Sequence, residues 1–160
     1  MVEQRVVNVP MEVGLRYASF ETRLVAFVLD VIVLFSMLAL FFTVAFLQIL
    51  LRSDFGDVDP PDSAFYLAAI ILLVYFFAFL PLYFVVLWAW RGQTVGKMAM
   101  AIKVVRTDGR PVGLGTAILR LIGYLLSSVL LFVGFLMIAF DRQRRALHDR
   151  LADTLVVEPR

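Results

Sequence analysis

The sequence predicts an all-α integral membrane protein with two transmembrane helices, a third apolar segment and a small cytoplasmic β-hairpin or strand element. Three observations support this prediction. Hydrophobic residues make up 62% of the 160 residues, charged residues make up only 18%, and the mean hydropathy of +0.90 is far above that of soluble domains. Two apolar stretches are each long enough to cross a bilayer. The charges are segregated, because basic clusters and one acidic loop alternate between the apolar stretches.

The chain begins with a short polar arm, which the sequence places before the membrane domain. Residues 1–16 show no helical periodicity and contain Pro10 and Gly14, which disfavour regular structure. We expect this arm to lie in the cytoplasm and the membrane domain to cover residues 17–158.

The first predicted helix, about residues 20–50, carries two opposite charges, Arg23 and Asp30. Seven helical residues turn the chain by roughly 700°, so both side chains lie on one face, about 10 Å apart along the axis. This spacing is long for a direct ion pair and leaves room for a third group, a water or an ion. A charge in the hydrocarbon costs at least about 2.5 kcal/mol on insertion scales and normally faces the protein interior with a partner. The pair is therefore a candidate functional site, with helix packing as the alternative.

The two apolar stretches are joined by an acidic connection, residues 51–63, which contains four Asp and one Arg. We expect a solvated outer loop, because the EF-hand pattern and its closing Glu are absent.

The second helix, residues 64–90, contains no charged residue and has aromatic residues at both ends, which is typical of a membrane span. Pro81 should kink this helix and free the carbonyl of Phe77.

A basic block, residues 91–116, follows the second helix and belongs in the cytoplasm by its charge. Its GQTVGK sequence, residues 92–97, superficially resembles a phosphate-binding loop. It has one residue too few between the glycines, and Met98 replaces the hydroxyl residue that would reach magnesium. The Asp108-Gly109 pair favours a tight turn, so residues 102–114 predict a small β-hairpin.

The third apolar segment, residues 117–140, is long enough to span the membrane once. A span would place the tail, residues 141–160, outside, yet the Arg-rich start of the tail favours the cytoplasm. We therefore favour a re-entrant hairpin over a third span, with both termini in the cytoplasm. The residues expected to break the segment are small or polar: Gly123, Ser127, Ser128 and Gly134.

The tail supplies two further expectations. Leu155–Val157 and Ile102–Val105 are short β-branched runs that should pair as strands. The basic residues next to the membrane, Arg142, Arg144 and Arg145, are candidates for contact with anionic lipid or a partner protein.

Several short motifs occur together in a fixed order: Tyr17-Ala18-x-Phe20-x-x-Arg23-Leu24-x-Ala26 with Asp30, Gly92-Gln93-Thr94-x-Gly96-Lys97, Leu119-Arg120, and Leu147-His148-Asp149-x-Leu151-Ala152-x-Thr154. The chain resembles the RDD family of small prokaryotic membrane proteins over about residues 14–158. The resemblance implies a functional set of one Arg and two Asp, which are Arg23, Asp30 and a tail residue. Asp149 is our choice for the tail residue, and Asp141 is the alternative. The resemblance also implies a multi-pass protein of the prokaryotic cell (inner) membrane.

The resemblance implies transport of an unidentified ligand, and sodium/proton antiport is attributed to some members. We therefore expect a proton-coupled cation (Na⁺/H⁺) transporter that acts as a homo-oligomer or with a partner membrane protein. The alternative is a non-transporting scaffold or accessory subunit whose basic cytoplasmic face binds membrane lipids or partner proteins.

We do not expect an enzyme, a cofactor, a metal site or nucleic-acid binding. His148 beside Asp149 suggests a general base with its orienting carboxylate, but no nucleophile accompanies them. The absence of Cys excludes thiolate chemistry and metal sites built on Cys.

Overall fold

The computed structural model describes residues 16–52, 62–129, 137–138, 141 and 143–158. The elements run in the order β1 (Arg16–Tyr17), α1 (Phe20–Arg52), α2 (Asp62–Val74), a π-helical segment η1 (Tyr75–Phe79), α3 (Leu80–Arg91), α4 (Val95–Ala99), β2 (Lys103–Arg106), α5 (Leu114–Val129), α7 (Leu147–Leu151) and β3 (Thr154–Glu158).

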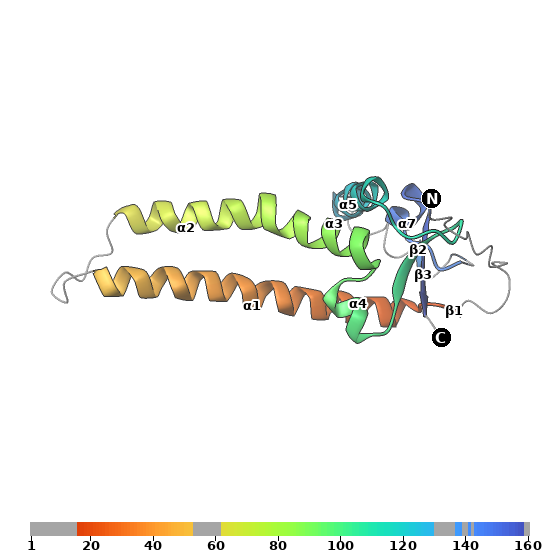
Figure 1. Ribbon diagram of the computed structural model, residues 1–160, viewed down its shortest axis with the longest axis horizontal. Helices are drawn as coiled ribbons and strands as arrows, with labels where there is room; N and C mark the ends of the chain where they lie inside the picture. Colours follow the sequence, from red (N-terminus) through yellow and green to blue (C-terminus); the bar gives the residue numbers. More distant parts are fainter. Residues whose placement is uncertain (1–15, 53–61, 130–136, 139–140, 142, 159–160) are drawn as a thin grey trace, which may run out of the picture.

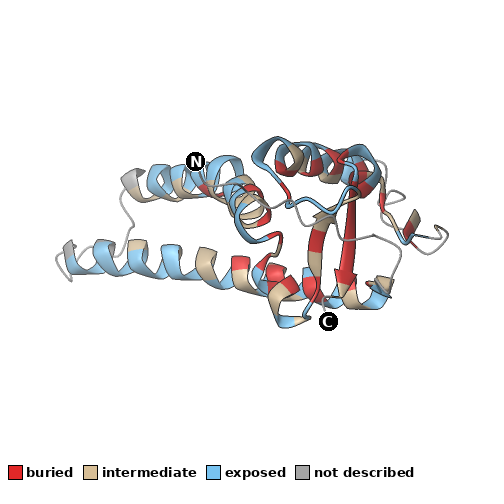
Figure 2. Cartoon of the chain, turned by 45° about the vertical axis from the view of Figure 1, so that its right-hand side comes forward, coloured by how far each residue is buried: buried red, intermediate tan, exposed pale blue. Residues whose placement is uncertain are grey.

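Two long apolar helical arms form a hairpin that dominates the fold. The first arm is α1, and the second runs continuously through α2, η1 and α3 beside it (Figure 1). Within these arms, Phe20–Gln48 and Ala64–Arg91 are long and apolar enough to cross a membrane. Most of their side chains are exposed (Figure 2), and in water such a surface would be unfavourable. The two predicted long helices are confirmed, and their apolar exposed surface is consistent with lipid contact.

The second arm widens by a π turn immediately before Pro81. The backbone N–H of Leu80 donates to the carbonyl of Tyr75, five residues back. Proline has no N–H, so the regular helical ladder is already interrupted at this point, which favours the wider turn. The Tyr75 hydroxyl donates to the carbonyl of Leu34 at 2.6 Å and ties the two arms together.

A three-stranded antiparallel sheet of order β1-β3-β2 lies at the end of the hairpin where α1 begins (Figure 1). Val104 pairs with Val156 and Val105 with Leu155, which confirms the predicted pairing of the tail with the basic block. The buried apolar core gathers at this end of the molecule (Figure 2) and includes Ala18, Ala26, Val85, Trp88, Ile102, Val104 and Val156.

The predicted β-hairpin at residues 102–114 is wrong, although its turn is present. Gly109 adopts a φ of 80°, and its N–H donates to the carbonyl of Arg106 at 2.9 Å. The chain after the turn forms no strand, and α5 begins at Leu114. Pro111 has no N–H to donate to a ladder, whereas β3 pairs with β2 along the whole length of β2.

The third apolar segment begins as one helix, α5, which does not follow the hairpin: it is seen nearly end-on in Figure 1, where the hairpin lies horizontal. The expected breaks at Gly123, Ser127 and Ser128 are wrong. Both serine hydroxyls donate to carbonyls one turn back, at 2.8 and 2.9 Å, which keeps them within the helix. Gly134 lies outside the described residues.

The position of β3 bears on the choice between a third span and a return of the chain. β3 pairs with β1, which directly precedes α1, and with β2, which follows α3 and α4. A single span between α5 and β3 would place β3 at the opposite end of the hairpin. β3 instead lies at the end of the hairpin where α1 begins, which favours the predicted return of the chain over a third span.

Candidate functional site

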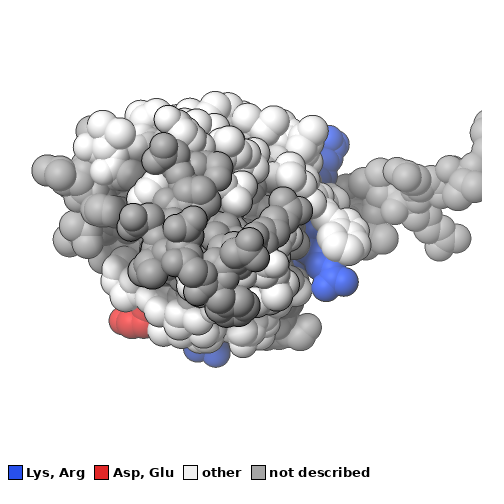
Figure 3. Space-filling model, turned by 90° about the vertical axis from the view of Figure 1, so that its left-hand side faces the viewer, with Lys and Arg blue, Asp and Glu red and all other residues white. Residues whose placement is uncertain are grey.

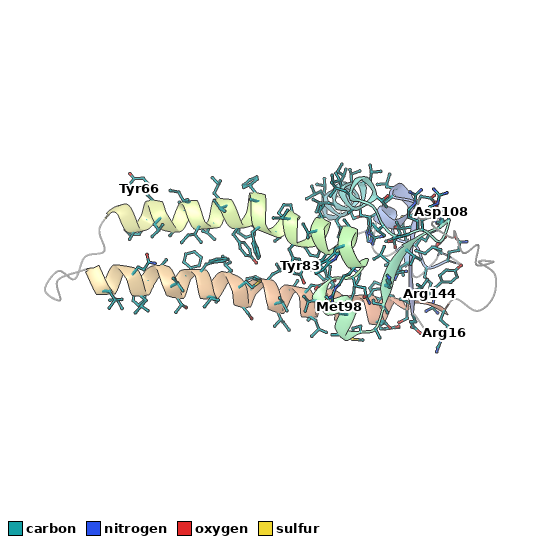
Figure 4. All side chains as sticks on the ribbon, in the orientation of Figure 1. Arg16, Tyr66, Tyr83, Met98, Asp108 and Arg144 are labelled. Atoms are coloured by element: carbon teal, nitrogen blue, oxygen red, sulfur yellow. The ribbon has the colours of Figure 1, made fainter. Side chains whose placement is uncertain are left out.

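Asp30 is a buried carboxylate that receives three hydrogen bonds from uncharged donors. The Tyr83 hydroxyl and the Gly96 N–H each lie 2.7 Å from Oδ1, and the Thr94 hydroxyl lies 2.5 Å from Oδ2. Asp30 is 1% exposed, and Figure 4 shows Tyr83 between the two arms of the hairpin. We call Asp30, Tyr83, Thr94 and Gly96 the Asp30 centre.

The GQTVGK sequence builds most of this centre. Gly92 ends α3 with a φ of 69°, a left-handed conformation that favours glycine. Thr94 caps the short helix α4, since its side chain accepts from the N–H of Lys97 at 3.4 Å. Gly96 allows α4 to touch α1, because a Cβ at this position would lie 1.9 Å from the carbonyl oxygen of Ala26. The motif that superficially resembles a phosphate loop therefore holds an anion of the chain itself, the Asp30 carboxylate.

Asp149 is a second buried carboxylate, and it lies between two guanidinium groups. Arg23 Nη1 lies 2.6 Å from Oδ2, and Arg120 Nη1 lies 2.7 Å from Oδ1. The N–H of Ala146 donates to Oδ2 at 3.1 Å, and Arg120 also donates to the Thr154 hydroxyl. Burial alone would raise the pKa of Asp149, but the charges of Arg120 and Arg23 hold it well below its usual range. We call Arg23, Arg120 and Asp149 the Asp149 triad.

The structure does not join Arg23 to Asp30. In the described part of the chain, Arg23 forms its ion pair with Asp149, and Asp30 forms no ion pair. The two side chains share one face of α1, as their spacing predicts, but they meet different elements. Asp30 contacts α4, whereas Arg23 contacts Asp149 of α7. The same Asp149 is also paired with Arg120 of α5.

Two further ionisable residues, Lys97 and His148, are buried beside these centres. Arg120 Cζ and Lys97 Nζ lie 5.1 and 5.4 Å from the centre of the Trp88 ring, distances at which cations interact favourably with an indole. Burial, with the nearby charge of Arg120, lowers the pKa of Lys97 to about 8. Burial lowers the pKa of His148 to about 3. Its imidazole is therefore neutral at pH 7, although Nε2 lies 3.5 Å from Asp149 Oδ1.

Asp141, the alternative tail carboxylate, lies apart from both centres at a more exposed position. It accepts from Arg150 Nη2 at 2.7 Å and from the N–H of Arg145 at 2.8 Å. The hydrogen bonds from Arg145 and Arg150 lower its pKa. Of the tail arginines predicted to contact lipid or a partner, Arg145 lies 3.7 Å from Asp141, Arg144 is exposed, and Arg142 lies outside the described residues.

Four residues of these centres were missed as site residues by the sequence analysis: Tyr83, Thr94, Gly96 and Arg120. Three of them belong to the sequence motifs quoted above, but the motifs alone do not say which carboxylate each residue meets. Tyr83 had no signal, because it is one of many aromatic residues in an apolar helix. Among the described residues, no group of three or more His, Asp or Glu side chains could hold a metal ion.

Comparison with known proteins identifies the family and several relatives of the chain. The sequence profile of the RDD family matches residues 17–153. YxaI of Bacillus subtilis, described as an uncharacterized protein, is 40% identical over 77 residues, which are 48% of this chain and 50% of YxaI. The proline-rich antigen homolog of Mycobacterium tuberculosis is 34% identical over 67 residues, 41% of this chain and 28% of that protein. The chain thus spans half or less of the length of these two relatives.

A longer match, at lower identity, is to the uncharacterized membrane protein YteJ of B. subtilis. The two are 27% identical over 143 residues, which are 88% of this chain and 80% of YteJ. No solved structure matches the chain.

Proposed function

Because this chain belongs to the RDD family of membrane proteins, we propose that it is a proton-coupled cation transporter in which Asp30 exchanges a proton for the cation. The observation that supports this proposal is the difference between the two buried carboxylates. Asp149 is neutralised by two guanidinium groups at 2.6 and 2.7 Å, whereas the three hydrogen bonds to Asp30 come from uncharged donors, and the nearby cation, Lys97, acts on it only through space. Asp30 is therefore the carboxylate whose charge is available to a proton or a metal cation such as Na⁺.

The Asp30 centre can satisfy both protonation states. An ionised carboxylate accepts all three hydrogen bonds from Tyr83, Thr94 and Gly96. A protonated carboxyl must donate one hydrogen bond, and a hydroxyl can turn from donor to acceptor, which a backbone N–H cannot do. The hydroxyl oxygen of Thr94 or Tyr83 can thus accept a hydrogen bond from the protonated carboxyl group of Asp30, so that its O–H is not left unpaired.

The described part of one protomer offers two membrane-length helices, which are too few to surround a transport path. We therefore propose that the functional unit is a homo-oligomer or includes a partner membrane protein. We place the sheet end of the hairpin, with both termini, in the cytoplasm of a prokaryotic cell, because the basic block and the Arg-rich tail lie there. A reporter fused after Arg160 would be inactive in the cytoplasmic assay and active in the periplasmic one if this placement were wrong.

A non-transporting scaffold or accessory subunit is the second candidate, and the Asp149 triad favours it. The triad connects α1, α5 and α7, which is a structural role that requires no change of charge. In that case the exposed basic residues of the sheet end would bind anionic lipid or a partner protein.

Flux measurements with the purified protein in liposomes would distinguish the two candidates. A sodium gradient should drive proton movement with the wild-type protein, and Asp30→Asn should abolish it, since an amide keeps the shape but cannot ionise. Asp141→Asn is the matched control, because this carboxylate lies outside both centres, and it should leave the flux intact. Equal flux with Asp30→Asn would contradict the proposal, and absence of flux with the wild-type protein would favour the scaffold.

A further inference from the structure

We propose that α5 (Leu114–Val129) lies flat in the membrane interface at the sheet end of the hairpin, with its outer apolar face among the lipid acyl chains of that leaflet. This inference needs the α1–α3 hairpin to span the membrane. It does not depend on transport by Asp30.

The two faces of α5 differ sharply in chemistry and in exposure. The inner face consists of small and polar residues, Ala117, Arg120, Gly123 and Ser127, and all four are buried. Gly123 brings α7 into direct contact, since a Cβ there would lie 2.6 Å from His148 Cα. The packing of α5 on the protein thus uses its less hydrophobic face.

The outer face repeats apolar residues three or four positions apart, which is the spacing of one helix face. Leu114, Ile118, Ile122, Leu125 and Val129 are between 44% and 81% exposed. In water such a stripe would be unfavourable, because apolar side chains of this size gain free energy when they are removed from water. The stripe therefore requires an apolar environment outside the protomer.

The contacts of α5 fix its depth along the hairpin. Tyr124 stacks on Trp88 and Phe84 of α3, with ring centres 5.2 and 6.4 Å apart. These two rings belong to the last turns of α3, which ends at Arg91 beside the exposed ring of Trp90. An exposed Trp next to an Arg marks the boundary between lipid and water. The level of α5 is therefore the interface and not the middle of the hydrocarbon.

The orientation of α5 agrees with this depth. In Figure 1 the hairpin lies horizontal and α5 is seen nearly end-on, so its axis is roughly perpendicular to the hairpin, and a bilayer crossed by α1 and α3 would contain α5 in its plane. Figure 4 shows Asp108, Arg144 and Arg16 at the sheet end and Tyr66 at the far end of the hairpin. Polar residues thus lie on the water side of α5.

Lipid is the occupant that the surroundings favour. α5 packs on α3, whose exposed Leu82 and Val86 belong to the membrane-facing surface of the hairpin. Seen along the hairpin from its loop end, the described surface is mostly uncharged, with acidic and basic side chains only at its edge (Figure 3). An amphipathic helix placed this way inserts its apolar face about 5–10 Å into the boundary between headgroups and acyl chains.

The chain has no Cys, so single Cys substitutions can carry spin labels at defined positions of the full-length protein in liposomes. Labels at Ile118, Ile122 and Val129 should all report one shallow depth by relative accessibility to oxygen and to a water-soluble nickel chelate. In a spanning or re-entrant arm, depth would change by about 1.5 Å per residue, or about 16 Å from Ile118 to Val129. Leu73 is the control for a deep position on the hairpin, and Arg110 is the control for water.

Three results would overturn the inference. A steady change of depth along α5 would show that it enters or crosses the membrane. Nickel accessibility equal to that of the Arg110 label would show that the face is in water. Low oxygen accessibility, with spin–spin broadening that disappears on dilution by unlabelled protein, would show that a second copy of the chain covers it. Because these positions are exposed, a melting temperature close to that of the wild type is the check that each labelled variant is folded.

Discussion

Replacing Asp149 by Asn should strongly destabilise the folded protein, because it removes the counter-charge of two buried guanidinium groups. Arg23 is 9% exposed and Arg120 is 0% exposed, and their Nη1 atoms lie 2.6 and 2.7 Å from the two carboxylate oxygens. Breaking one buried pair typically costs about 3–5 kcal/mol. Two cations lose their partner here, so we expect a loss near the upper end of that range.

The partner of Arg23 can be identified by comparing two double-mutant cycles. Arg23→Gln combined with Asp149→Asn should lose less stability than the sum of the single changes, with a coupling of about 1–3 kcal/mol. Arg23→Gln combined with Asp30→Asn should be additive within about 0.5 kcal/mol, because no contact joins this pair. Free energies of unfolding from denaturant titrations in mixed micelles at pH 7 provide the measurement. A coupling of Arg23 to Asp30 as large as its coupling to Asp149 would refute the assignment.

Three further predictions concern the tight contact of α4 and the two buried bases. Gly96→Ala should lower the free energy of unfolding by about 3 kcal/mol, because the new Cβ would lie 1.9 Å from the Ala26 carbonyl oxygen. Gly115→Ala is the control: a Cβ there would have nothing within 4 Å, so the change should raise the free energy of unfolding by about 0.5–1 kcal/mol. The pKa of Lys97 is lowered from 10.5 to about 8, so between pH 8 and pH 10.5 only the unfolded chain binds the proton. The free energy of unfolding should therefore rise with pH across this window. Lys97→Met should remove that rise in denaturant titrations at pH 7.5 and 10. The pKa of His148 is lowered from 6.5 to about 3, so the stability of the fold should fall as the pH drops from 6.5 towards 3. His148→Gln should reduce the difference in melting temperature between pH 7 and pH 4. An unchanged difference would contradict a buried neutral imidazole.

The long helices and the strand pairing could be predicted because their signals are local. Apolar length identifies α1 and the α2–α3 arm, and two β-branched runs identify β2 and β3. The partners of the buried charges could not be predicted in this way. The spacing of Arg23 and Asp30 gives the face of α1 but not what lies opposite, and Arg23 meets a residue 126 positions away.

The third apolar segment carries sequence signals that conflict with one another. The length of the run indicates a span, whereas the charge of the tail opposes one, and together they favour a re-entrant hairpin. Both readings place the segment inside the membrane. A different signal was present, because Ala117, Arg120, Gly123 and Ser127 recur at helical spacing and form one face of α5. A helix with such a face packs on protein with that side and leaves its apolar side outward, which neither a span nor a hairpin requires.

In the proposed transport cycle, protonation of Asp30 changes the hydrogen bonds of the Asp30 centre but not the ion pairs of the Asp149 triad. This difference decides which part of the protein responds when Asp30 is protonated. Hydrogen bonds to a charged group contribute about 1.5–3 kcal/mol each, whereas those between neutral groups contribute about 0.5–1.5 kcal/mol. A proton on Asp30 therefore weakens each of its bonds to Tyr83, Thr94 and Gly96 and with them the contact of α4 with α1. The Asp149 triad keeps its charges, so α1 stays fixed to α5 and α7. Protonation should consequently loosen α4, which carries the buried Lys97, while the rest of the sheet end remains in place.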